Sequence, residues 1–117
     1  VQMGRLLTIR KDFPGAIQYY QTALGINDQS PDAHFNLGFI YLHTGYYDAA
    51  RKSYESCLAL SPSYKDEVLT NLGIVELKTK NKDRASQLFK EALDLNPNNM
   101  IAKNQLANIS KGQPGAR

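Results

Sequence analysis

The chain has 117 residues, of which 42% are hydrophobic, and this gives room for one domain with a modest core. Its 14 Lys and Arg against 11 Asp and Glu leave a net charge of +3, too small to argue for a nucleic-acid partner. No apolar run approaches the roughly 18 residues that a membrane span needs, and the single cysteine excludes an internal disulfide. The compartment stays open, with the cytoplasm favoured and a bacterial envelope as the alternative.

Apolar residues recur with the 3.6-residue period of amphipathic helices, and no strand-like alternation stands beside that period. Seven helices are predicted in chain order, at about Val1–Arg10, Pro14–Ile26, Pro31–Thr44, Tyr47–Leu60, Asp66–Thr79, Lys82–Leu95 and Asn99–Lys111. Gly45 suits the left-handed conformation that ends many helices. Since the chain lacks an initial methionine and begins inside its first helix, we expect that helix to miss its opening turn.

Small and large residues keep one register along the chain. A small residue recurs every 34 or 35 residues in the first helix of each pair, at Gly4, Gly38, Gly73 and Ala107. In the second helices an alanine is followed four residues later by an aromatic residue, at Ala16 and Tyr20, Ala50 and Tyr54, and Ala85 and Phe89. Because a small residue lets a large one approach closely, these columns predict packed helix pairs.

One copy of this pattern reads His34-x2-Leu37-Gly38-x2-Tyr41, then Ala50-x3-Tyr54, then Pro62. It resembles a tetratricopeptide repeat, whose pattern is W-x2-L-G-x2-Y, A-x3-F and P over about 34 residues. The resemblance implies an all-α fold, a right-handed α-solenoid of antiparallel helix pairs. The repeat domain would cover residues 1–111, with repeats at about 1–30, 31–65 and 66–99, a C-terminal capping helix at 100–111 and a disordered tail at 112–117.

The chain departs from the family pattern at several positions. Glu76 stands in the column of Leu7 and Tyr41, and Lys80 stands in the column of Gly45. These departures leave open whether the third repeat packs as tightly as the second.

No motif for catalysis, a cofactor or a metal is present. The sequence has no phosphate-binding glycine loop and no HExxH pair, and His34 and His43 have the wrong spacing for two ligands on one helical face. Cys57 shares a column with Ala23 and Ala92, which indicates a small buried residue rather than a reactive thiol. We therefore expect a non-enzymatic protein that binds no cofactor.

In the resembled family the first helices of the repeats line a concave groove for a peptide or a partner helix. Carried onto this sequence, the partner-binding groove would consist of Phe35, Asn36, Phe39, Leu42, His43, Asn71, Ile74, Leu77, Lys78, Asn104, Gln105 and Asn108, together with Arg5, Thr8 and Thr70. Phe35 and Phe39 are surplus to the packing columns, and an exposed apolar patch usually has a partner. The alternative is that a neighbouring repeat or upstream chain covers them.

The amides Asn36, Asn71 and Gln105 follow one another along the repeats. Such amides can hold a partner's backbone, as in the asparagine ladder of some family members, or they can hydrogen-bond between neighbouring helices. Another branch of the family binds acidic C-terminal tails with a basic clamp. The corresponding positions here are Phe35, Phe39, Asn71, Ile101 and Gln105, so that ligand class is excluded for this groove.

Basic residues gather where first helices end, at Arg10, Lys11, Lys78 and Lys80, near Lys82 and Arg84. They compensate helix dipoles or form a docking edge for an acidic partner. The predicted function is protein–protein binding by a scaffold or adaptor. The alternatives are a substrate-recruiting or regulatory domain of a larger enzyme, and a module that self-associates end to end through residues 1–7.

Overall fold

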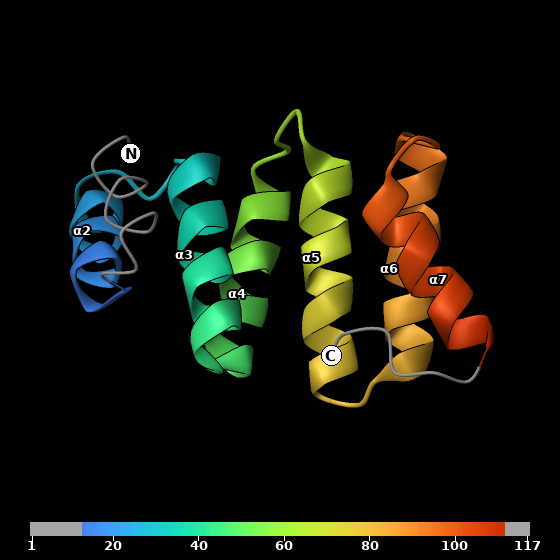
Figure 1. The fold of residues 1–117 in the computed structure, drawn as a ribbon. Helices are drawn as coiled ribbons and strands as arrows, with labels where there is room; N and C mark the ends of the chain where they lie inside the picture. Colours follow the sequence, from blue (N-terminus) through green and yellow to red (C-terminus); the bar gives the residue numbers. More distant parts are fainter. Residues whose placement is uncertain (1–12, 112–117) are drawn as a thin grey trace. The chain divides into compact units, whose positions relative to one another are not determined.

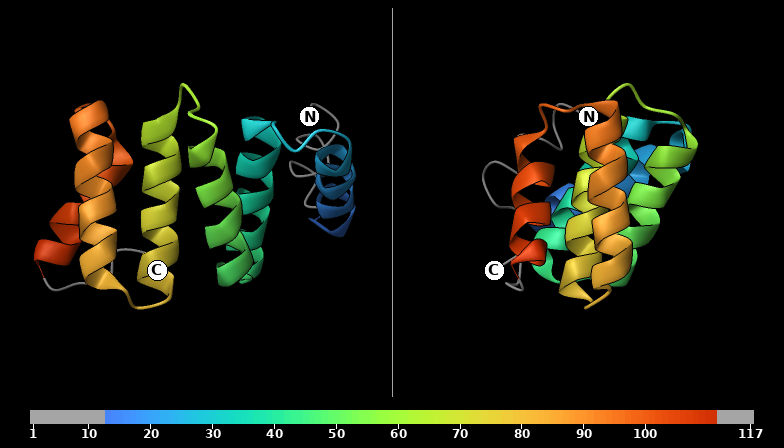
Figure 2. Two further views of the ribbon diagram at one scale, coloured as in Figure 1. Left: turned by 180° about the vertical axis from the view of Figure 1, so that it is seen from behind. Right: turned by 90° about the vertical axis from the view of Figure 1, so that its right-hand side faces the viewer.

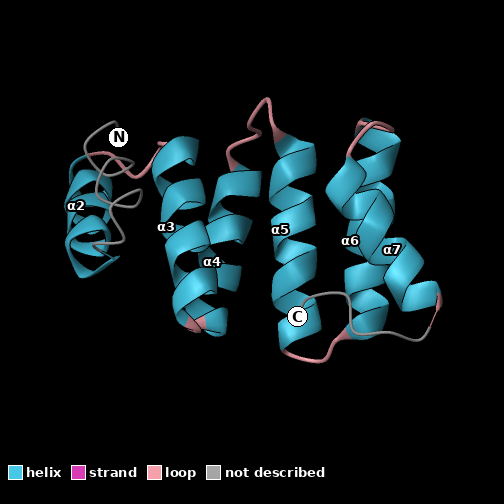
Figure 3. Cartoon of the chain, in the orientation of Figure 1, coloured by secondary structure: helices cyan, strands magenta, loops and turns pink. Residues whose placement is uncertain are grey.

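The computed structural model describes residues 13–111, which form six α-helices and no strand (Figure 1, Figure 3). The helices are α2 (Phe13–Ile26), α3 (Pro31–Thr44), α4 (Tyr47–Ala59), α5 (Lys65–Lys78), α6 (Lys82–Leu95) and α7 (Met100–Ser110). Each begins and ends within one residue of its predicted bounds. The helix predicted before residue 13, its predicted role in self-association and the tail predicted to be disordered lie outside the described residues.

The chain divides into two compact units, Val1–Pro62 and Ser63–Arg117. In the first unit α3 packs against α2 and α4. Ala16 and Tyr20 of α2 are buried against Ala33, Leu37 and Ile40 of α3. Ser30 caps α3, since its Oγ accepts a hydrogen bond from the Ala33 N–H at 3.2 Å.

In the second unit α6 packs against both α5 and α7, and Figure 2 shows α7 beside α6 from two further sides. The apolar core takes Val68, Leu72 and Val75 from α5 and Leu88 and Phe89 from α6. Asn99 caps α7 by accepting a hydrogen bond from the Ala102 N–H at 3.0 Å.

Inside each unit, the small residue of the first helix contacts the aromatic residue of the second helix, as the sequence pattern predicted. A Cβ atom added to Gly38 would lie 2.9 Å from the Tyr54 ring, and one added to Gly73 would lie 2.6 Å from the Phe89 ring. Both rings are fully buried. At this contact the third repeat packs as tightly as the second, because glycine and ring approach as closely there.

The turn between α3 and α4 follows the Schellman pattern. Gly45 is left-handed, with φ 86°, and the Tyr46 N–H donates to the Tyr41 carbonyl at 2.9 Å. The apolar contact that accompanies this pattern is made by the Tyr41 and Tyr46 rings, whose centroids are 6.2 Å apart.

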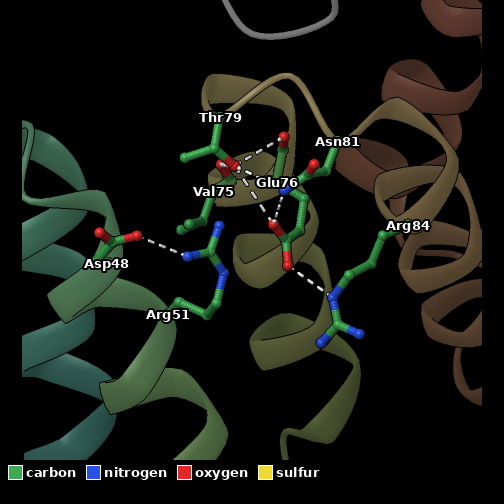
Figure 4. Close-up of polar contacts among 7 residues, drawn as sticks. All are labelled: Asp48, Arg51, Val75, Glu76, Thr79, Asn81 and Arg84. Carbon is green, nitrogen blue, oxygen red and sulfur yellow. Dashed lines mark hydrogen bonds and ion pairs between the residues drawn. The ribbon is translucent and has the colours of Figure 1, made fainter.

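The turn between α5 and α6 has the same backbone with different side chains. Lys80 is left-handed, with φ 68°, and the Asn81 N–H donates to the Glu76 carbonyl at 2.7 Å. In place of two rings, the Asn81 amide donates to Glu76 Oε1 at 3.0 Å and Arg84 Nε donates to Glu76 Oε2 at 2.6 Å (Figure 4). Thr79 donates to the same Oε1 at 3.4 Å.

Glu76 is consequently a core residue, since its side chain is only 1% exposed. A buried carboxylate is tolerated when charge-assisted hydrogen bonds replace its hydration. Glu76 leaves no packing defect at this column, because its carboxylate is hydrogen-bonded by Asn81 and Arg84. These two residues stand where the second repeat has Tyr46 and Ala49.

Candidate protein-binding faces

Four of the predicted groove residues form a partly exposed surface in the first unit. Phe35, Asn36, Phe39 and His43, here called the α3 face, lie on neighbouring turns of one helix. The Phe39 and His43 rings stack with centroids 4.1 Å apart, and His43 Nδ1 lies 3.0 Å from the Phe39 carbonyl oxygen. Phe35 makes an edge contact with the Tyr54 ring at 5.8 Å. The aromatic rings are thus held by their neighbours while part of their surface remains in solvent.

Two residues expected in the groove are buried. Leu42 is 8% exposed and Thr70 is 2% exposed. Leu42 lies one turn after Gly38 and so shares the side of α3 that packs against α4. Thr70 donates to the Asp66 carbonyl at 2.8 Å. Neither side chain presents much surface to a partner.

The second unit carries the remaining predicted residues. Asn71, Ile74 and Leu77 of α5 are partly exposed and Lys78 is exposed; these four are called the α5 face. Asn104 of α7 is exposed, while Gln105 and Asn108 are partly exposed. Arg5 and Thr8 lie outside the described residues.

The side-chain amides of Asn36 and Asn71 make no hydrogen bond with any residue between 13 and 111. Within that range, the alternative of hydrogen bonds between neighbouring helices therefore does not account for them. Each amide is available to donate to and accept from a partner's backbone.

The structure has a pocket of about 370 Å³ whose lining side chains are hydrogen-bonded to one another, and the sequence did not predict it. It lies in the second unit, among the first turns of α5 and α7 and the loop before α7. Asp66 Oδ2 accepts from the Asn96 and Asn99 amides, at 3.1 and 3.0 Å, and Asn99 also donates to Thr70 Oγ1 at 2.9 Å. The run Asn96-Pro97-Asn98-Asn99, rich in residues that hydrogen-bond backbone and neighbours, was the available signal.

The basic edge is less uniform than the sequence suggested. Lys80, Lys82 and Arg84 are all exposed, but Arg84 also pairs with the buried Glu76. Arg84 therefore stabilises the turn between α5 and α6, whatever else it contacts.

The other polar candidates lie in ordinary surroundings. His34 Nε2 is 3.0 Å from the Asp28 carbonyl oxygen, and Cys57 is fully buried, as its column predicted. Between residues 13 and 111 no three His, Cys, Asp or Glu side chains are grouped as a metal would require. Within the same residues no helix has the length and apolar character to cross a membrane.

Two protein-family models match the chain. The model described as "Tetratricopeptide repeat" matches residues 29–98, and the model described as "TPR repeat" matches residues 4–45. Hsp70-Hsp90 organizing protein 1 of Glycine max is 28% identical over 98 residues, which are 84% of this chain. The chain spans 17% of the length of that relative.

Solved structures share the fold. The first TPR of Spaghetti (RPAP3), bound to the HSP90 peptide SRMEEVD, superposes with a TM-score of 0.89 at 22% identity, over 95% of this chain and 87% of that one. YrrB, described as a TPR protein with an unusual peptide-binding site, gives a TM-score of 0.83 at 22% identity, over 96% of this chain and 58% of that one. The fold class is therefore all-α, of the helical-repeat type.

Proposed function

The chain belongs to the tetratricopeptide repeat family, and from this premise we propose that it is a non-catalytic protein-binding module. It holds an extended or helical segment of another protein against exposed side chains of a first helix, such as those of the α3 face. Two solved relatives of the same fold have peptide sites, according to their descriptions. These peptide sites support a protein or peptide partner for this chain. The residues that contact the partner are inferred from the side chains of this chain.

The α3 face is the observation that carries the proposal. Phe35 and Phe39 expose part of their rings although the core columns of α3 are already filled by Leu37, Gly38 and Ile40. Buried aromatic side chains contribute much of the binding energy in most interfaces. The Asn36 amide, on the same helix and partly exposed, supplies hydrogen bonds to a partner's backbone, which sets the register of the segment.

The test is calorimetric titration with a partner captured by the intact protein and identified by mass spectrometry. Phe39→Ala should weaken binding by about 2 kcal/mol or more, the magnitude of an interface hot spot. Asn36→Ala should weaken it by about 0.5–1.5 kcal/mol, the net value of a typical hydrogen bond. Circular dichroism confirms that each variant is folded.

Tyr46→Ala is the matched control, because it removes the aromatic ring of a residue that is 63% exposed and lies outside the α3 face. We expect its affinity to equal that of the wild type. Normal binding by Phe39→Ala, together with loss of binding in Lys82→Ala on the basic edge, would reject the α3 face as the site.

A further inference from the structure

The pocket in the second unit has a rigid polar frame. Asn99 commits both amide hydrogens, to Asp66 and Thr70, and its oxygen accepts from the Ala102 N–H. Asn96 donates to Asp66, and its oxygen accepts from the Asn98 N–H at 3.1 Å. Asp66 is therefore fixed through its Oδ2 atom. No residue between 13 and 111 donates a hydrogen bond to its other oxygen, Oδ1. The frame thus leaves a preorganised acceptor on the pocket wall.

The charge of the pocket is negative. Asp66 and Glu67 both line it, and no Lys, Arg or His does. The N-termini of α5 and α7 meet here and each contributes roughly half a positive charge. Two carboxylates outweigh them, so the pocket favours a cation over an anion.

Part of the lining is apolar. Met100 and Ile101 line the same pocket and are 59% and 58% exposed. A lysine or arginine side chain has an apolar stem and a charged head, and it buries the stem while the head finds polar partners. One such side chain would match both features, with its stem against Met100 and Ile101 and its head at Asp66.

We propose that this pocket takes a lysine or arginine side chain of the bound segment, with Asp66 as the acceptor for its charged head. The inference rests on the proposed function, and it names a feature of the partner: a cationic residue. A segment that carries an acidic residue at that position is disfavoured by the two carboxylates.

The experiment titrates the full chain with four mixtures of labelled nonapeptides whose ends are acetylated and amidated. The central residue is Arg, Lys, Gln or Glu, and the flanking positions vary among neutral residues only. Fluorescence anisotropy should give affinities about tenfold or more tighter for the Arg and Lys mixtures than for the Gln and Glu mixtures, as expected for a charge-assisted hydrogen bond.

Asp66→Asn keeps an oxygen that accepts from Asn96 and Asn99 and removes the charge, so the preference for Arg and Lys should disappear in this variant. Asp83→Asn is the matched control, because it makes the same change in the first turn of α6, away from the pocket, and should keep the preference. Circular dichroism shows whether both variants are folded.

Equal affinities for all four mixtures, or a preference that survives Asp66→Asn, would overturn the cationic anchor and leave segment binding intact. A tighter complex with the Glu mixture would overturn it as well. Absence of binding by every mixture would count against this inference and the proposed function together.

Discussion

Two helical glycines of the first unit differ in the space that is available for a Cβ atom in place of a glycine hydrogen. A Cβ added to Gly38 would lie 2.9 Å from two Tyr54 ring carbons, while one added to Gly25 meets nothing within 4 Å. Gly38→Ala should therefore lower the free energy of unfolding by about 1–3 kcal/mol through overpacking. Gly25→Ala should raise it by about 0.5 kcal/mol, because alanine loses less backbone entropy in a helix. Urea denaturation of both variants against wild type measures the difference.

Since the chemical change is the same at both positions, the opposite signs isolate the effect of packing. An unchanged denaturation midpoint for Gly38→Ala would mean that the Tyr54 ring can move away from the added methyl group. The Gly38–Tyr54 contact would then not limit how closely α3 and α4 approach.

At the scale of the element, the turn from α5 to α6 depends on a buried carboxylate. Arg84→Ala removes the partner of Glu76, which is 1% exposed, and leaves its charge incompletely paired. Losing one partner of a buried pair costs about 3–5 kcal/mol. Arg84 is itself 49% exposed, so we expect a smaller loss, of about 2–3 kcal/mol in the free energy of unfolding.

Lys82→Ala is the control on the same edge, and its effect on stability should stay within about 0.5 kcal/mol, as for most exposed substitutions. The triple variant Glu76→Tyr, Asn81→Tyr, Arg84→Ala gives this turn the side chains found at Tyr41, Tyr46 and Ala49. It should recover part of the loss in Arg84→Ala, because residues in contact do not act additively. Equal stability of Arg84→Ala and wild type would show that the ion pair contributes nothing.

The elements themselves were predictable because the 3.6-residue period and the spacing of small and large residues are properties of the sequence alone. The helix bounds and the Gly38–Tyr54 and Gly73–Phe89 contacts follow from them. The hydrogen bonds around Glu76 and the Asp66 pocket could not be predicted in this way, because they depend on side-chain directions at turns rather than on periodicity. One signal was available for the first: Glu76, Asn81 and Arg84 replace Tyr41, Tyr46 and Ala49 at corresponding positions.

At the scale of the whole molecule, the fold does not determine which ligand is bound. The chain superposes with a TM-score of 0.89 on a TPR domain that was solved with the HSP90 peptide SRMEEVD. At 22% identity this likeness extends to the fold and not to the residues that contact a peptide. The ligand must therefore be predicted from the chemistry of this chain.

We predict that SRMEEVD binds this protein no more tightly than SRMQQVN with an amidated end, a counterpart that keeps the arginine and removes the acidic groups. The positions that resemble the basic clamp of the family hold Phe35, Phe39, Asn71, Ile101 and Gln105, none of which is charged. Asp66 and Glu67 line the pocket beside Asn71 and Ile101 and repel further carboxylates. Calorimetric titration of the full chain with both peptides checks this, and tighter binding of SRMEEVD would show that basic residues elsewhere on the chain serve as its clamp.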